Sequence, residues 1–144
     1  MSRLVLIGVA ILSLAFAPAP LPRRPATRGG DYTRIQGAWV LQSQVQGGNK
    51  WPGGDVRWVL GAGKLEIRTG GHSYHWEYAI DPKANPRALD MRYRPNGGDA
   101  SELKAVYSLD GDTLKIAYDA GNRGQRPKGL DGDGFVMIFR REGR

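Results

Sequence analysis

Residues 103–118, LKAVYSLDGDTLKIAY, have the pattern of one complete β-hairpin. Asp110-Gly111 interrupts the alternation for two residues, and this dipeptide suits the positive φ angles that a tight two-residue turn requires. Such a short turn fixes both the direction and the register of its two strands. The residues that we expect on one shared face are Leu103, Ala105, Tyr107, Leu109, Leu114, Ile116 and Tyr118.

The chain from Ile35 onward repeats this alternation in short segments separated by turns. The 21 glycines and 9 prolines suit many short strands, and no amphipathic helix of ten or more residues is visible in this part. Cysteine is absent, so stability must come from the core and not from disulfides. With the two strands of the hairpin, the pattern predicts eight strands, of which the other six are 37–46, 56–60, 64–69, 73–80, 88–93 and 135–141.

Eight short antiparallel strands close most economically into an up-and-down barrel, because closure leaves no unpaired edge. The predicted fold class is therefore all-β, an eight-stranded antiparallel up-and-down barrel, with a two-sheet sandwich as the alternative. The last strand, 135–141, is apolar on both faces. This suggests that both faces are covered, and chain N-terminal to the domain is the predicted cover.

The N-terminal residues 1–17 have the pattern of an export signal, with Arg3 before a mostly apolar run that ends in Ala15-Phe16-Ala17. The apolar run is too short for a typical membrane span. Pro18 disfavours cleavage directly before it, so the sequence leaves two fates open, a cleaved signal or a retained N-terminal membrane tether. Residues 18–34, rich in proline and arginine, form the predicted linker, and 35–144 form the barrel domain. The expected location is the periplasm, the cell envelope or the outside of the cell.

The formal net charge of +7 belongs mainly to the N-terminal part. Five of the 21 basic residues and one of the 14 acidic residues precede Ile35, which leaves 16 basic and 13 acidic residues in the domain. The two signs are interspersed there, without the basic stripe and exposed aromatics of a nucleic-acid-binding surface. We therefore expect no nucleic-acid partner. The sequence does not specify an oligomeric state.

No set of residues predicts catalysis or metal binding, and no cofactor is indicated. His72 and His75 are the only histidines, and on a strand an odd spacing places them on opposite faces. The aspartates near Gly111 and Gly132 fit turns better than a calcium loop. An enzyme would require a polar cluster inside the barrel, for which His75, Glu77 and Asp90 are the candidates to examine.

Four spaced motifs resemble a lipocalin-like domain family that is abundant in planctomycete bacteria. Residues 35–40 (IQGAWV) are similar to its opening (L/I)QG-x-W, and residues 78–90 (YAIDPKANPRALD) resemble its central Y-x-(L/I)-D-P … P-(K/R)-A-(L/I)-D motif. Residues 107–115 (YSLDGDTLK) resemble its hairpin, and Arg126-Pro127 resembles the RP that follows. The resemblance covers about 35–142. It implies an exported, eight-stranded lipocalin-like barrel of uncharacterised function, and it supplies no catalytic residues.

Large aromatic residues gather on the face that we predict to point inward. They either fill the barrel as its core or line a small cavity for an apolar or amphipathic molecule. The first option predicts a structural or interaction module that engages envelope proteins or polysaccharide, and the second predicts a binding module. The candidate ligand-binding residues are Trp39, Trp58, Trp76, Tyr78, Tyr93 and Tyr107.

Overall fold

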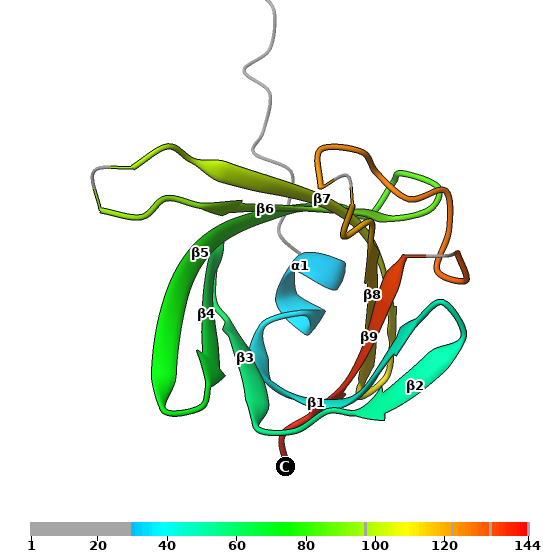
Figure 1. Cartoon of the computed structure of the whole chain (residues 1–144), viewed down its shortest axis with the longest axis horizontal. Helices are drawn as coiled ribbons and strands as arrows, with labels where there is room; N and C mark the ends of the chain where they lie inside the picture. Colours follow the sequence, from blue (N-terminus) through cyan, green and yellow to red (C-terminus); the bar gives the residue numbers. More distant parts are fainter. Residues whose placement is uncertain (1–29, 97, 122, 133, 144) are drawn as a thin grey trace, which may run out of the picture.

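The computed structural model describes residues 30–96, 98–121, 123–132 and 134–143. The predicted signal segment and most of the predicted linker lie outside these residues. The described chain forms a strongly curved antiparallel sheet that surrounds one short helix (Figure 1). The elements are α1 (Asp31–Arg34), β1 (Gly37–Gln46), β2 (Asn49–Pro52), β3 (Val56–Leu60), β4 (Lys64–Thr69), β5 (His72–Asp81), β6 (Ala88–Tyr93), β7 (Ser101–Asp110), β8 (Thr113–Tyr118) and β9 (Phe135–Arg141).

Eight of the nine strands form a closed antiparallel barrel, which confirms the predicted fold class. Each strand from β3 to β8 pairs with the next one in the chain, and β1 pairs with both β3 and β9 to close the ring. The ninth strand, β2, pairs only with the second half of β1. The sequence did not predict β2, because its four residues are all exposed and carry no alternating apolar pattern.

The hairpin of β7 and β8 is confirmed, but its turn lies one residue later than predicted. Asp110 pairs with Thr113, so the two turn residues are Gly111 and Asp112. Gly111 has a φ of 54°, and no non-glycine residue of the described chain has a positive φ. Glycine in the first turn position and an ordinary residue in the second match a type II′ turn.

Asp31–Arg34, the last residues of the predicted linker, form α1, which packs into one end of the barrel. Figure 1 shows α1 inside the ring of strands. Ile35, which directly follows the helix, is 0% exposed within the main core cluster. We call the end of the barrel that holds α1 the closed end; the turns β3–β4, β5–β6 and β7–β8 lie around it. The open end is the opposite one, at β4–β5, β6–β7 and β8–β9.

A β-bulge halfway along β1 changes which of its residues point into the barrel. Leu41 pairs with Phe139, but after a register shift Ser43 pairs with Ile138 and Gln44 pairs with Met137. Because Met137 faces the interior, the shift turns Gln44 inward at the open end. Trp51 of β2 is opposite Gln44 and therefore extends the interior face of the sheet beyond the barrel.

The second apolar face of β9 has a different cover from the one predicted. Val136 and Ile138 belong to a second apolar cluster, outside the barrel, which also includes Leu130. Leu130 comes from the β8–β9 loop and not from chain N-terminal to the domain. The reason is geometric: the loop that carries Leu130 starts directly after β8, whereas the described N-terminal residues lie inside the barrel.

Candidate functional site

The closed end is sealed by hydrogen bonds to α1. The Asp31 carboxylate, 8% exposed, accepts a hydrogen bond from the Tyr107 hydroxyl at 2.8 Å and pairs with Arg87 at 3.1 Å. Burial, together with the hydrogen bond to the Asp31 carboxylate, raises the pKa of the Tyr107 hydroxyl, so it remains a donor. The Tyr32 hydroxyl donates to the carbonyl of Ile80 at 2.8 Å. These contacts join the helix to residues roughly fifty to eighty positions away in the chain.

Trp39 fills the closed end beneath α1. Its indole is 0% exposed and donates a hydrogen bond to the Ile35 carbonyl at 2.8 Å. The guanidinium of Arg141 lies 4.2 Å from the centre of this ring, and it donates a hydrogen bond to the carbonyl of Gln36 at 2.8 Å. Side chains therefore fill the space around Trp39, and the hollow of about 180 Å³ at this end lies beside Tyr32 and is not lined by Trp39.

The open end contains an apolar cavity of about 220 Å³. Seven strands and the β8–β9 loop contribute to it, and the strand residues are those whose register places them on the inner face. Alternation produces this lining directly, since every second residue of each strand points inward. The lining residues are Val56, Trp58, Ile67, Trp76, Met91, Leu103, Tyr118, Arg123 and Met137.

Two of the six predicted ligand-binding aromatics, Trp58 and Trp76, line this cavity. Trp39 and Tyr107 are buried at the closed end. The Tyr78 hydroxyl donates to the carbonyl of Gly61 near the closed end. Tyr93 packs on Trp76 with ring centres 5.1 Å apart and is not a lining residue. The predicted set is thus divided between the two ends of the barrel.

The lining residues that the sequence prediction omitted are mainly aliphatic. Alternation places Met91 and Leu103 on the inner face, but the predicted ligand-binding residues are all aromatic and so do not include them. The aromatic Tyr118, also on the inner face by alternation, is missing from that set too. Arg123 could not be predicted in this way because it lies in a loop, where no periodicity tells which way a side chain points. A cavity needs space between side chains, and the sequence pattern does not show where that space remains.

The backbone of the β8–β9 loop is attached to the barrel next to the cavity. The amide of Lys104 donates to the carbonyl of Arg123 at 2.8 Å. Three residues later, the Arg126 guanidinium donates to the carbonyl of Ala105 and pairs with the Asp90 carboxylate, both at 2.6 Å. Arg126 therefore fastens the loop to β6 and β7, and Arg123 is held at the cavity mouth.

Exposed aromatic residues extend the inner face around the open end. Tyr74 is opposite Ile67, a cavity residue, and Trp51 is opposite Gln44 on the inner face of β1. Among the described residues, these two are the large apolar side chains with more than two fifths of their surface exposed. Single exposed apolar residues are common on proteins, but two at the same barrel mouth widen its apolar rim.

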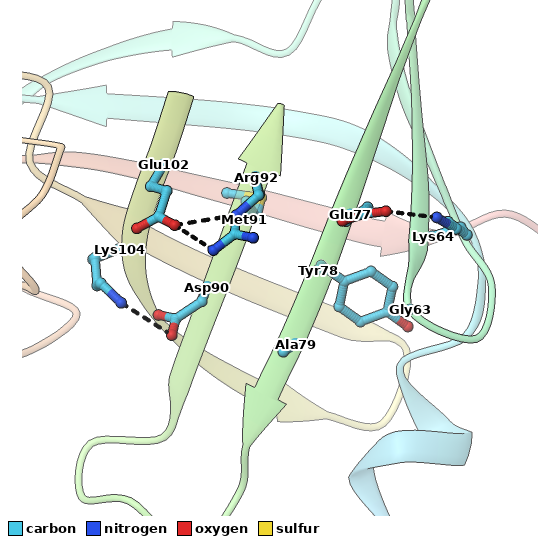
Figure 2. Close-up of a pocket in the computed structure, with 10 residues that line it drawn as sticks. All are labelled: Gly63, Lys64, Glu77, Tyr78, Ala79, Asp90, Met91, Arg92, Glu102 and Lys104. Atoms are coloured by element: carbon cyan, nitrogen blue, oxygen red, sulfur yellow. Dashed lines mark hydrogen bonds and ion pairs between the residues drawn. The ribbon is translucent and has the colours of Figure 1, made fainter. Parts of the chain in front are cut away.

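A second hollow, of about 410 Å³, lies on the outer surface over β4–β7 (Figure 2). Figure 2 shows its charged side chains joined in pairs. Lys64 pairs with Glu77 at 2.8 Å, and Lys104 pairs with Asp90 at 3.3 Å. Arg92 donates to Glu102, with its Nε at 3.1 Å. Because its cations and anions neutralise one another, this larger hollow is a weaker candidate than the cavity at the open end.

The structure does not bring the candidate catalytic residues together inside the barrel. His75 and Glu77 are exposed on the outer face of β5, and Asp90 lies on the outer face of β6, where it pairs with Lys104 and Arg126. The pKa of Glu77 is lowered by its hydrogen bond and charge pairing with Lys64. Within residues 30–143, gaps aside, no group of three or more His, Cys, Asp or Glu side chains is arranged to hold a metal ion.

Comparisons with family models, curated proteins and solved structures found no match for this chain. The resemblance to the lipocalin-like planctomycete family therefore stays a prediction from the four motifs. In the part of the chain that the structure describes, no helix has the length and apolar character needed to cross a membrane. The geometry of the barrel is the basis for the functional argument.

Proposed function

We propose that this protein is an exported, lipocalin-like binding module that takes a small apolar or amphipathic molecule into the open end of its barrel. One observation carries the proposal: the barrel is sealed by α1 at one end, while the other end keeps an apolar cavity of about 220 Å³. Protein interiors are normally packed without large voids, so a cavity of this size in a small barrel is a candidate binding site.

The size of the cavity limits the ligand. Apolar cavities of about 150 Å³ hold benzene, whereas sites for drug-sized ligands run from about 300 Å³ upward. A single ring or an alkyl chain of moderate length therefore fits best. Burying about five methylene groups contributes about 4 kcal/mol, which corresponds to a dissociation constant of about 1 mM before the cost of association.

Tryptophan fluorescence tests this proposal with 1-octanol, a neutral amphiphile that does not absorb in the indole range. Trp58 and Trp76 line the cavity, so their emission should shift and saturate at millimolar octanol. A Val56→Phe variant places a ring in the cavity mouth and should weaken octanol binding at least tenfold. Val59→Phe is the matched control, because it makes the same change on the same strand but on the outer face.

Two results would overturn the binding proposal. One is a linear, unsaturated response of the wild-type emission to octanol. The other is equal loss of binding in Val56→Phe and Val59→Phe, since a change on the outer face should leave a ligand inside the barrel untouched.

The second candidate is an interaction module whose rim engages an envelope protein or polysaccharide. The exposed Trp51 and Tyr74 side chains favour it, because large apolar side chains left exposed at the mouth of the barrel are available to a partner. A Trp51→Ser/Tyr74→Ser double variant should lose a reproducible envelope partner in a pull-down and still bind octanol. If the double variant instead loses octanol binding and keeps its envelope partner, the result would support the cavity, and not the rim, as the functional site.

A further inference from the structure

The charge at the cavity mouth indicates which kind of small molecule the open end binds, and this inference rests on the proposed function. We infer that the molecule bound at the open end is a small apolar carboxylic acid, with its hydrocarbon part inside the barrel and its carboxylate at Arg123.

Arg123 is distinct from the other residues of the cavity lining. Of the described residues that form this lining, it alone carries a charge, and the others are apolar or aromatic. Several other arginines of the barrel have acidic partners: Arg92 pairs with Glu102, Arg126 with Asp90 and Arg141 with Asp112. Arg123 forms no ion pair with another described residue. A guanidinium beside an apolar cavity suits an amphiphile with a negative head group.

The loop geometry fixes the backbone from which this cation extends. The carbonyl of Arg123 accepts a hydrogen bond from the Lys104 amide, directly after the cavity residue Leu103. Arg126 fixes the same loop through the Asp90 carboxylate and the Ala105 carbonyl. A positively charged side chain held at the mouth meets a ligand head group with less loss of conformational entropy than one on a free loop.

Tyr118 provides a second polar group beside Arg123. Its ring lines the cavity and stacks on Phe135, with ring centres 5.5 Å apart. Burial raises the pKa of the Tyr118 hydroxyl, and the positive charge of Arg123 opposes part of that rise. The hydroxyl therefore stays protonated at neutral pH and is able to donate a hydrogen bond. A carboxylate at the mouth accepts from both groups, whereas an ammonium group is repelled by Arg123.

The test compares three ligands with the same tail, octanoate, 1-octanol and octylammonium, by tryptophan fluorescence of the full chain at pH 7.5. Octanoate should bind about tenfold more tightly than octanol, and octylammonium more weakly than octanol. Arg123→Gln should remove the preference for octanoate and leave octanol affinity within twofold. Lys128→Gln is the matched control, since it removes one positive charge from the same loop at an exposed residue outside the cavity lining.

The outcomes separate this inference from the proposed function. If octanol and octanoate both fail to saturate, the binding proposal itself is wrong. If both bind equally, or if Lys128→Gln lowers octanoate affinity as much as Arg123→Gln, the carboxylate assignment is wrong while the binding site stands. An octanoate preference that disappears only in Arg123→Gln, with unchanged thermal unfolding of that variant, supports the inference. Tyr118→Phe should lower octanoate affinity by a smaller factor, about threefold.

Discussion

The two ends of this barrel are built from the same strands but differ in how their interior is filled. At the closed end, α1, Trp39 and Tyr107 occupy the space and satisfy their polar groups with one another. At the open end, Trp76 and Tyr118 are only partly buried around a cavity of about 220 Å³. Aromatic residues on the same inner face are thus core at one end and cavity lining at the other.

This difference shows that the burial of a side chain in a small barrel depends on what covers the end, as well as on the strand pattern. The strands supply an inward face along their whole length. The short helix supplies the cover at one end only, and it is held there by a carboxylate, a hydroxyl and a guanidinium from separate parts of the chain. The closed end is therefore expected to contribute stability, and the open end is free to bind a ligand.

The same substitution made at both ends gives the largest expected contrast. Trp39→Ala should destabilise the protein by about 4 kcal/mol, because it creates a large cavity among fully buried residues. Trp76→Ala should cost only about 1–2 kcal/mol, since the side chain is half-buried and already borders a cavity. Chemical denaturation followed by circular dichroism measures both values. Equal losses would contradict the division into a stabilising end and a binding end.

Removing the buried Asp31 carboxylate at the closed end should have the next largest effect on stability. Asp31→Ala should cost about 2 kcal/mol, because it leaves the buried Tyr107 hydroxyl without its acceptor. Adding Tyr107→Phe should then recover part of the loss, since the unpaired hydroxyl is removed. A double-mutant cycle in urea measures this coupling. Additive effects of the two substitutions would mean that the contact between Asp31 and Tyr107 does not hold α1 in place.

The barrel could be predicted from the sequence because its determinants are local. Alternation along each strand and short glycine turns such as Gly70-Gly71 specify strand pairing between neighbours in the chain. Closure of the ring by β1 and β9 followed from the count of strands, because eight strands of this length avoid edges by closing.

The parts that could not be predicted depend on contacts between distant residues. The helix α1 has only four residues, too few for a periodic signal, and its position is set by Tyr107, 76 residues away. The strand β2 is fully exposed, so pairing with β1 and not burial defines it. Arg123 lies in a loop whose path is fixed by Arg126 and Asp90.

A smaller effect is expected from the apolar contact that holds the β8–β9 loop to the outside of the barrel. Leu130→Ala should cost about 1 kcal/mol, because Leu130 is partly buried against Val106, Ala117 and Val136. Its effect on octanoate binding should be larger than on octanol binding, since the loop carries Arg123. Chemical denaturation measures the loss of stability, and the fluorescence titration measures the two affinities. Equal weakening of both ligands would show that the loop supports the cavity as a whole and not its charge.

The smallest effect concerns Glu66, on the outer face between the two ends, and it provides a reference that neither end should influence. Its hydrogen bonds with Arg68 lower the pKa of Glu66 from the ordinary 4.5 to about 2. Since the folded state holds the ionised form, this contribution to stability is present above about pH 4.5 and is lost as the pH falls toward about 2. Glu66→Gln should therefore flatten the decline in the urea midpoint over this range. The pair is exposed, so the difference should be small and should vanish at high salt. A Glu66→Gln variant whose acid profile matches the wild type at low salt would mean that the pair contributes nothing to folding.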